Sequence, residues 1–380
     1  MRILVNISNL KIGGALQVAY SFMSEIINLT TNHKFYVVLS DEIDKELNFK
    51  LKNPKKNIKI FKLNSFPGPL FKGIKARKEL YAIESLVKPD VVFSIFGPTY
   101  WKPKTIHVSG FAAGWTINPD SIAFQVLSVM DRVKKKFQNW IKLKSSIRES
   151  SFFIVETLTV KNRLNKYAKV PLENIFVVGN TYGNHFNIDI SEKKFILPIK
   201  KDEHEFRFVT ITANYPHKNL SIINSIIPLL IKKKLNVKFY LTIPQDEFKE
   251  NFDNFKNHLI NLGPIKVEDC PVVYRDSDAL FLPTLLESFT ASYPEAMISR
   301  KPILTSDLDF SHDICGDAAC YFNPLDPVDI VDKIEQIVLD KSFYDNLVSL
   351  GTSRVSTFSS AKVRIEQYIS ICEKIDKINK

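Results

Sequence analysis

The sequence predicts an α/β protein made of two Rossmann-like domains, each a doubly wound parallel sheet. Short apolar runs, suited to strands buried on both faces, alternate with longer segments whose apolar residues recur at helical spacing. This rhythm occurs twice, and a charged, aperiodic stretch separates the two halves. A chain of 380 residues is also long enough for two domains that each bury a core.

The first half begins with a strand, a glycine-bearing turn, a helix and a second strand. RILVNIS (2–8) and KFYVVLS (34–40) are the strands, and residues 15–29 carry apolar side chains at helical spacing. Further strands are predicted at residues 90–97, 105–110, 152–156 and 174–180.

The pattern lapses from residue 184 to residue 205, where the chain is charged and contains a proline. It then restarts, with strands at 206–212, 237–243, 278–284 and 302–306 and helices at 220–233, 295–299 and 327–339. The predicted boundaries are 1–190 for the first domain, 191–205 for the linker, 206–355 for the second domain and 356–380 for a C-terminal helix returning toward the first domain.

Composition narrows the classes of function. No apolar run is long enough to span a bilayer, and the first residues turn polar after Val5, so we expect a cytoplasmic protein. The four cysteines form no CxxC pair, which favours packed, reduced thiols over a zinc site or a disulfide framework. The net charge of +11 indicates anionic partners, and without a nucleic-acid-binding motif we expect nucleotides or lipid headgroups rather than DNA.

The stretch PTLLESFTASYPEAM follows a predicted strand and holds Glu287 and Glu295 eight residues apart. Pro294 suits the first turn of a helix, and Ser288, Thr290 and Ser292 are candidate caps for it. A helical span of eight residues measures roughly 12 Å, which suits two carboxylates gripping separate parts of one long ligand. From these residues alone, a dipole-complementing Glu295 and a solvated Glu287 are the more economical interpretation.

Several ordered blocks resemble the retaining glycosyltransferases of glycosyltransferase family 4, whose fold is named GT-B. The family carries a Glu, seven residues, Glu motif after a strand that ends near proline, as here. EAMISRKPILTSDLDFSHDICGDAACYFNPLDPVDIVDKI and, before the motif, NLGPIKVEDCPVVYRDSDALFLPT are similar to family segments. In the first half, NLKIGGA and ETLTVKNRLNKYAKVPLENIFVVGNTYG resemble its glycine-bearing first loop and its closing segment.

The resemblance implies two domains facing a central cleft, with the acceptor on the first and a UDP- or GDP-linked sugar on the second. Glu295 would hold the ribose, Glu287 the donor sugar, and Lys218 the diphosphate. The backbone from Ser288 through Phe289 and Thr290 to Ala291 would lie near the sugar and diphosphate. Gly13 and Gly14 would let the backbone approach the phosphates, and Gly263 would lie against the base.

The implied reaction is transfer of a hexosyl or N-acetylhexosaminyl group with retention of anomeric configuration and without a required metal or other cofactor. The acceptor would be a glycan or lipid-linked glycan of a bacterial surface polysaccharide such as lipopolysaccharide. Two departures from the family pattern stand out. Thr212 and Asn214 occupy the region where the family usually carries a basic residue, and Ser288 and Thr290 replace glycines.

His107 lies in TIHVSGFAAGW, which we interpret as a strand and the loop after it. A histidine at a cleft-facing strand end would orient donor or acceptor hydroxyls and join Glu287 and Lys218 as a catalytic residue. A packed histidine is an equally weighted alternative.

The spacing of apolar and basic residues between 121 and 150 predicts a basic amphipathic helix. Leu127, Met130, Lys134, Phe137 and Ile141 share one stripe, with Val126, Val133 and Trp140 beside it. Such a helix would either lie on the anionic inner face of the cytoplasmic membrane or be an ordinary helix with a solvated basic face.

Three other functions remain open on the sequence. A glycoside hydrolase also uses two carboxylates but needs no nucleotide-binding blocks. A nucleotide-sugar epimerase or hydrolase on the same fold fits the Glu-x₇-Glu motif poorly. A non-catalytic nucleotide-sugar-binding protein is favoured by the missing basic residue.

Overall fold

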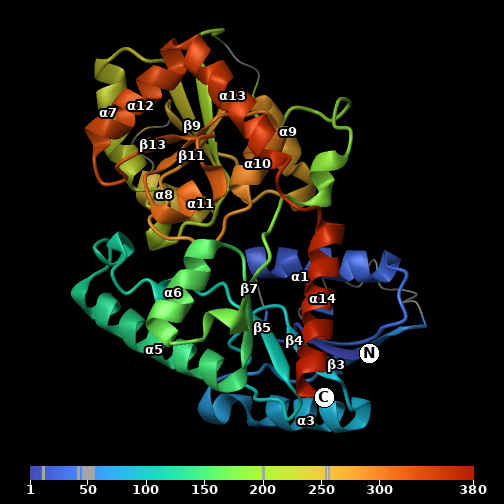
Figure 1. The fold of residues 1–380 in the computed structure, drawn as a ribbon. Helices are drawn as coiled ribbons and strands as arrows, with labels where there is room; N and C mark the ends of the chain where they lie inside the picture. The colour runs from blue at the N-terminus through green and yellow to red at the C-terminus, as the bar shows by residue number, and fades with distance from the viewer. Residues whose placement is uncertain (11–12, 41–42, 45–55, 199–201, 253–254, 256) are drawn as a thin grey trace. The chain divides into compact units, whose positions relative to one another are not determined.

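The structure is a computed structural model that describes the chain except residues 11–12, 41–42, 45–55, 199–201, 253–254 and 256. It divides into two compact units. The first unit contains residues 1–119, 130–180 and 359–380, and the second contains residues 120–129 and 181–358. Each unit is a doubly wound parallel sheet, so the predicted fold class is confirmed (Figure 1).

The first unit is built on a seven-stranded sheet in the order β3-β2-β1-β4-β5-β6-β7, with every pair parallel. Its strands are β1 (Arg2–Asn6), β2 (Lys34–Ser40), β3 (Ile58–Leu63), β4 (Val91–Ser94), β5 (His107–Gly110), β6 (Phe152–Val155) and β7 (Ile175–Val177). Its helices are α1 (Gly14–Asn28), α3 (Ile74–Val87), α4 (Gly114–Ile117), α6 (Leu158–Ala168), α14 (Ala361–Asn379) and most of α5 (Val129–Glu149).

Alternating side chains of β1 show how this sheet is covered on both faces. Ile3 and Val5 point into a core formed with α1 and α14, which lie side by side in Figure 1. Leu4 points to the opposite face and packs in a cluster with Ala76 and Leu80 of α3. This two-sided burial explains the continuous apolar strands in the sequence.

The second unit contains a six-stranded parallel sheet in the order β10-β9-β8-β11-β12-β13. Its strands are β8 (Phe206–Thr210), β9 (Val237–Leu241), β10 (Leu259–Asn261), β11 (Ala279–Leu282), β12 (Ile303–Ser306) and β13 (Cys320–Phe322). Its α-helices are α7 (Ile222–Lys232), α8 (Gln245–Phe252), α9 (Cys270–Asp276), α10 (Ser292–Ile298), α11 (Asp309–Cys315), α12 (Pro327–Leu339) and α13 (Lys341–Val355). Helices α7 and α12 share a core with one face of the sheet, and α9, α10 and α11 with the other.

Domain limits differ from the expected ones at the boundary between the units. The first unit ends its second segment at Asn180, and the second unit resumes at Thr181 rather than after residue 205. Part of the expected linker, residues 191–205, is packed structure: Leu197 is 1% exposed and lies in the core cluster that contains Tyr274. The C-terminal helix α14 groups with the first unit.

No helix in the described part of the chain is long and apolar enough to cross a lipid bilayer. All four cysteines are free and buried, as the prediction of packed thiols requires.

Candidate functional site

Each sheet has a point where the strand order reverses, between β1 and β4 in the first unit and between β8 and β11 in the second. Open parallel sheets bind ligands just beyond the carboxyl ends of the strands at such switch points. In the second unit, the strand β8 leads to the short 3₁₀ helix η5 (Pro216–Lys218), and β11 leads to the loop that carries Glu287.

Hydrogen bonds fasten these two loops of the second unit to each other. The Leu285 N–H donates to the His217 carbonyl oxygen at 2.7 Å. Asn219 follows Lys218 in a left-handed conformation (φ 53°), and its amide donates to the Pro324 carbonyl at 2.8 Å. The backbone that presents Lys218 is thus fixed before any ligand binds.

Lys218 and Glu287 form an ion pair, with side chains only 14% and 11% exposed. The Thr284 hydroxyl lies 3.0 Å from Glu287 Oε1 and 3.1 Å from the His217 carbonyl oxygen, so its one proton serves two acceptors. Lys218 and Glu287, which were each expected to contact the donor, therefore contact each other directly. The carboxylate neutralises the charge of the partly buried ammonium.

Glu295 occupies the first turn of α10, as the position of Pro294 predicts. The predicted side-chain cap is wrong: Ala291 is the N-cap residue, and no side chain caps the helix. The Tyr274 hydroxyl lies 3.5 Å from Glu295 Oε2 and donates to the Ser292 carbonyl at 3.2 Å. Burial is the main cause that raises the pKa of Glu295 to about 7.

The segment between the two glutamates is irregular, so the span estimated for a continuous helix does not apply. Ser288 and Thr290 are buried, while Phe289 packs partly against the core shared with α10. The backbone from Ser288 to Ala291 follows the carboxyl end of β11, where the resemblance implies contact with sugar and diphosphate.

Gly263 follows β10 with φ at +73°, a conformation that favours glycine, and a Cβ there would meet no atom within 4 Å. Sequence patterns did not predict strand β10, although Gly263 was among the predicted site residues.

The loop of Thr212 and Asn214, where the sequence lacks the basic residue of the family pattern, is hydrogen-bonded to the residue that follows β9. The Thr212 N–H donates to Thr242 Oγ1 at 3.2 Å, and Asn214 is half-buried. The His217 ring stacks on Tyr215, with centroids 5.7 Å apart.

In the first unit, Gly13 and Gly14 stand where α1 begins, in the loop after β1. Gly13 has φ at +77°, and a Cβ on either glycine would meet nothing within 4 Å. Asn9 links this loop to the one after β4 by donating to the carbonyls of Phe96 and Pro98 at 2.7 and 3.2 Å. The two glycines therefore lie in a loop beside the switch point of their own sheet.

The expected position of His107 is wrong. It is the first residue of β5, not a residue at the carboxyl end of a strand, and it is 3% exposed. Its Nε2 lies 2.8 Å from Ser94 Oγ, and its Nδ1 lies 2.8 Å from both the Glu149 carbonyl oxygen and Ser150 Oγ. Burial lowers its pKa to about 4, so it is a neutral, packed histidine at pH 7.

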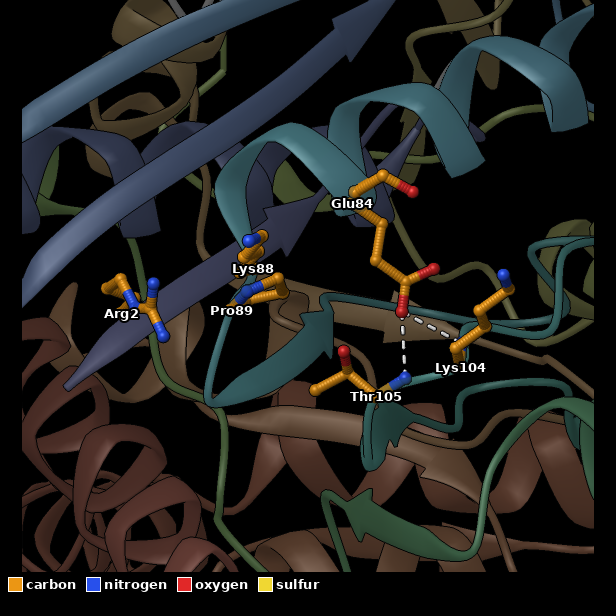
Figure 2. A pocket seen from close by; sticks show the side chains of 7 residues that line it. Arg2, Glu84, Lys88, Pro89, Lys104 and Thr105 are labelled. Atoms are coloured by element: carbon orange, nitrogen blue, oxygen red, sulfur yellow. Dashed lines mark hydrogen bonds between the residues drawn. The ribbon is translucent and has the colours of Figure 1, made fainter.

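Figure 2 shows a pocket of about 330 Å³ in the first unit, near the start of β1 and the end of α3. Glu84 Oε1 accepts bonds there from the backbone N–H groups of Lys104 and Thr105 at 2.8 and 2.7 Å. The lining residues are Arg2, Glu84, Ser85, Lys88, Pro89, Lys104 and Thr105. Because it lies at the amino end of β1 and contains no predicted site residue, we do not assign it to the reaction.

Sequence reasoning missed Thr284 and Tyr274, which hold the two glutamates in place. Thr284 lies two residues after the end of β11, and its place between that strand and Glu287 is the signal that could have marked it as a site residue. Tyr274 lies 21 positions before Glu295 on α9, and nothing in the local pattern connects them.

Comparison with known protein families yields one matching model, described as "Glycosyl transferases group 1", over residues 175–340. This range contains Lys218, Gly263, Glu287 and Glu295. A curated relative is the "O-antigen chain mannosyltransferase RfbU" of Salmonella typhimurium, 26% identical over 219 residues. The match covers 54% of this chain and spans only 57% of that relative's length.

Solved structures match over nearly the whole chain. Anabaena Alr3699/HepE, crystallised with UDP and glucose, has a TM-score of 0.69 at 13% identity, covering 98% of this chain and 100% of that one. WaaG, described as a glycosyltransferase involved in lipopolysaccharide biosynthesis, has a TM-score of 0.67 at 11% identity, covering 98% and 99%. At these identities the likeness establishes the shared two-domain GT-B fold.

Proposed function

We propose that this chain is a retaining glycosyltransferase that moves a sugar from a nucleotide diphosphate to an acceptor hydroxyl. The observation that carries the proposal is the Lys218–Glu287 pair at the switch point of the second sheet, on the unit that also holds Glu295. The family match over residues 175–340 supports it, because that range contains all three residues.

The donor would extend across the carboxyl ends of β8 and β11. Lys218 would leave Glu287 for the diphosphate, which carries more negative charge than one carboxylate. Glu287 would then be released to accept hydrogen bonds from hydroxyls of the donor sugar. Glu295 would accept bonds from the ribose hydroxyls, with Gly263 against the base.

The reaction breaks the bond between the anomeric carbon and the β-phosphate oxygen. It forms a bond from that carbon to the acceptor oxygen on the same face of the sugar. The acceptor proton passes to the departing phosphate oxygen, and Lys218 stabilises the negative charge that develops there. Positioning and charge stabilisation by these residues replace a strong protein base.

The relatives' descriptions favour a bacterial surface polysaccharide as the acceptor, either lipid-linked or growing. One is called an O-antigen chain mannosyltransferase, and another is described as involved in lipopolysaccharide biosynthesis. UDP is a donor candidate because Alr3699/HepE was crystallised with it, and GDP is the other candidate class.

A non-catalytic nucleotide-sugar-binding protein is the second candidate. The observation that favours it is the region of Thr212 and Asn214, which supplies no cation beside Lys218. Binding without turnover would identify this function.

The test is a thermal-shift panel of UDP, GDP, ADP and their sugar conjugates, followed by detection of released nucleoside diphosphate with glycan acceptors. Ligand at a hundredfold its dissociation constant should add about 2.7 kcal/mol to the free energy of unfolding. We expect one base to stabilise the wild type, and Lys218→Ala and Glu295→Ala to lose that effect.

Lys233→Ala is the matched control, since Lys233 also pairs with carboxylates, Asp332 and Glu335, but at the far end of α7. It should keep the full shift. If no nucleotide stabilises the wild type, the proposed donor site is wrong.

A further inference from the structure

Helix α5 buries polar side chains and exposes apolar ones, the reverse of an ordinary surface helix. Its buried residues are Asn139, Ser146 and Glu149. The Asn139 amide donates to the Trp115 carbonyl at 3.1 Å, and Glu149 accepts from the backbone of Thr99 and Tyr100 at 2.7 and 3.0 Å. Hydrogen bonds, together with Leu143 packed against a core cluster, therefore hold the helix to the first unit.

The large apolar residues of α5 point to solvent instead. The outward face, here called the α5 stripe, consists of Val129, Met130, Val133, Phe137 and Trp140, each between 58% and 83% exposed. At about 100° per residue, the five side chains fall within roughly 100° of arc. The Phe137 and Trp140 rings stack, with centroids 6.2 Å apart.

This stripe corrects the one expected from the sequence. Leu127 precedes the helix, and Ile141 is half-buried, so neither belongs to the outward face. Val133 and Trp140, expected beside the stripe, lie within it.

Basic residues border the stripe. The helix carries seven lysines and arginines and two acidic residues, one of which is the buried Glu149. Lys134 is exposed at one edge of the stripe, and Lys144 and Arg148 are exposed beyond its C-terminal end. Lys135 points elsewhere, over the Trp115 ring at 4.7 Å.

We propose that the α5 stripe docks the protein on an anionic lipid surface, with Phe137 and Trp140 in the interface and the flanking lysines near the headgroups. Apolar side chains bordered by an excess of cations match a bilayer that is apolar below and negative at its surface. A neutral protein surface would match the apolar residues but not the cations. An acidic protein surface would match the cations but not the apolar residues. Figure 1 shows α5 along the outer edge of the first unit, which leaves it open to a planar surface.

The test is co-sedimentation with vesicles of phosphatidylglycerol and phosphatidylcholine, and with phosphatidylcholine alone, at low ionic strength. The wild type should bind the anionic vesicles, and added salt should weaken binding. Phe137→Gln with Trp140→Gln should reduce the partition coefficient at least tenfold. Lys134→Gln with Lys144→Gln should reduce it about fivefold per charge removed.

Matched controls come from α3 and the turn before it, in the same unit. Phe71 is 84% exposed, and Lys75 and Lys78 are exposed on α3. Phe71→Gln with Leu86→Gln, the latter 69% exposed on α3, removes two exposed apolar side chains, and Lys75→Gln with Lys78→Gln removes two charges. Both variants should bind as the wild type does. Because Trp101 is buried and the half-buried Trp115 ring is covered by Lys135, most of a blue shift of tryptophan emission on vesicles should be lost in Trp140→Phe.

Wild-type protein that stays in the supernatant with anionic vesicles would overturn the proposal. So would unchanged binding of the Phe137→Gln, Trp140→Gln variant. A dimer in sedimentation velocity that this variant dissociates, without vesicle binding, would assign the stripe to a second copy of the chain. The vesicle test needs no nucleotide, so its outcome is independent of the proposed transferase activity.

Discussion

At the residue scale, the two glutamates of the Glu-x₇-Glu motif have different surroundings and therefore different acid–base behaviour. Glu287 lies against the Lys218 ammonium, whereas Glu295 forms no ion pair with any described residue and lies beside the Tyr274 hydroxyl, which donates to the Ser292 carbonyl. Burial therefore raises the pKa of Glu295 to about 7. Glu295, the motif residue that we propose holds the ribose, therefore titrates in the physiological pH range.

This predicts that donor binding weakens below pH 7. An ionised Glu295 can accept bonds from two ribose hydroxyls, whereas a protonated one must use one oxygen as a donor. Because its pKa is about 7, the ionised fraction falls about tenfold per pH unit below that value. Nucleotide affinity, measured by calorimetry between pH 5 and pH 8, should fall below pH 7 by up to about tenfold per pH unit.

The control is Glu295→Gln, which should bind more weakly at pH 8 but lose the part of the pH dependence due to the carboxyl group. The nucleotide's own phosphate ionisation affects both proteins equally, so their difference isolates Glu295. Parallel pH profiles for the two proteins would contradict the ribose role.

At the residue scale, motifs in the sequence marked individual positions, but they did not indicate which side chains the fold brings into contact. Lys218 and Glu287 were singled out separately, and the structure joins them. His107 was expected after a strand because its apolar neighbours extend on both sides, which hides where β5 begins. Its hydrogen bonds to Ser94 and Ser150 depend on pairing between distant segments.

At the element scale, the strands that the sequence did not predict are β3, β10 and β13, all at the edges of their sheets. An edge strand has one neighbour and less burial, so its sequence mixes polar with apolar residues. IKIFKL of β3 shows this, with lysines facing outward beside buried Ile58 and Leu63. Interior strands such as β6 and β11 are apolar throughout and were predicted for that reason.

The C-terminal helix α14 supplies part of the first unit's core, which leads to a prediction about stability. Ile375 is fully buried, whereas Ile378, three residues later on the same helix, is 63% exposed. Ile375→Ala should lower the free energy of unfolding by about 2–5 kcal/mol, because it leaves a cavity among packed side chains. Ile378→Ala should change it by less than about 0.5 kcal/mol.

Urea denaturation followed by tryptophan fluorescence measures this in the right unit. Trp101, Trp115 and Trp140 are the only tryptophans, and all three lie in the first unit. Ile375→Ala should therefore move the fluorescence transition to lower urea. Equal effects of the two substitutions would mean that α14 does not pack on the first unit in solution.

At the scale of the whole molecule, local sequence patterns could not predict which segments of the chain belong to which unit. Residues 120–129 group with the second unit although they lie within the first half of the sequence, and Ser121 Oγ lies 3.4 Å from the Leu285 carbonyl oxygen. The polar stretch 184–205, which includes the predicted linker 191–205, marked a break between domains, yet Phe186, Ile196 and Leu197 pack into the second unit's core. Such groupings arise from contacts between distant residues, which periodicity does not record.

Buried titratable groups in both units predict how stability depends on pH. Burial raises the pKa of Glu149, Glu156 and Glu295 from 4.5 to about 7, so the folded state holds protons that the unfolded state releases. Each therefore makes the free energy of unfolding fall as pH rises from about 4.5 to about 7. Burial lowers the pKa of His107 from 6.5 to about 4, and this group acts in the opposite direction as pH rises between those values.

Burial also lowers the pKa of His185, and because three carboxyl groups oppose two imidazoles, we expect stability to decline between pH 5 and pH 7. Glu149→Gln isolates one contribution, since its Oε2 accepts three hydrogen bonds and its Oε1 has no partner among the described residues. Relative to the wild type, the variant should gain on the order of 3 kcal/mol between pH 5 and pH 8 as the wild-type carboxyl ionises. Glu366→Gln, on the exposed face of α14, should show no such gain in the same urea titrations. A constant difference between wild type and Glu149→Gln across this range would mean that Glu149 is ionised throughout, with its burial cost offset by the Thr99 and Tyr100 hydrogen bonds.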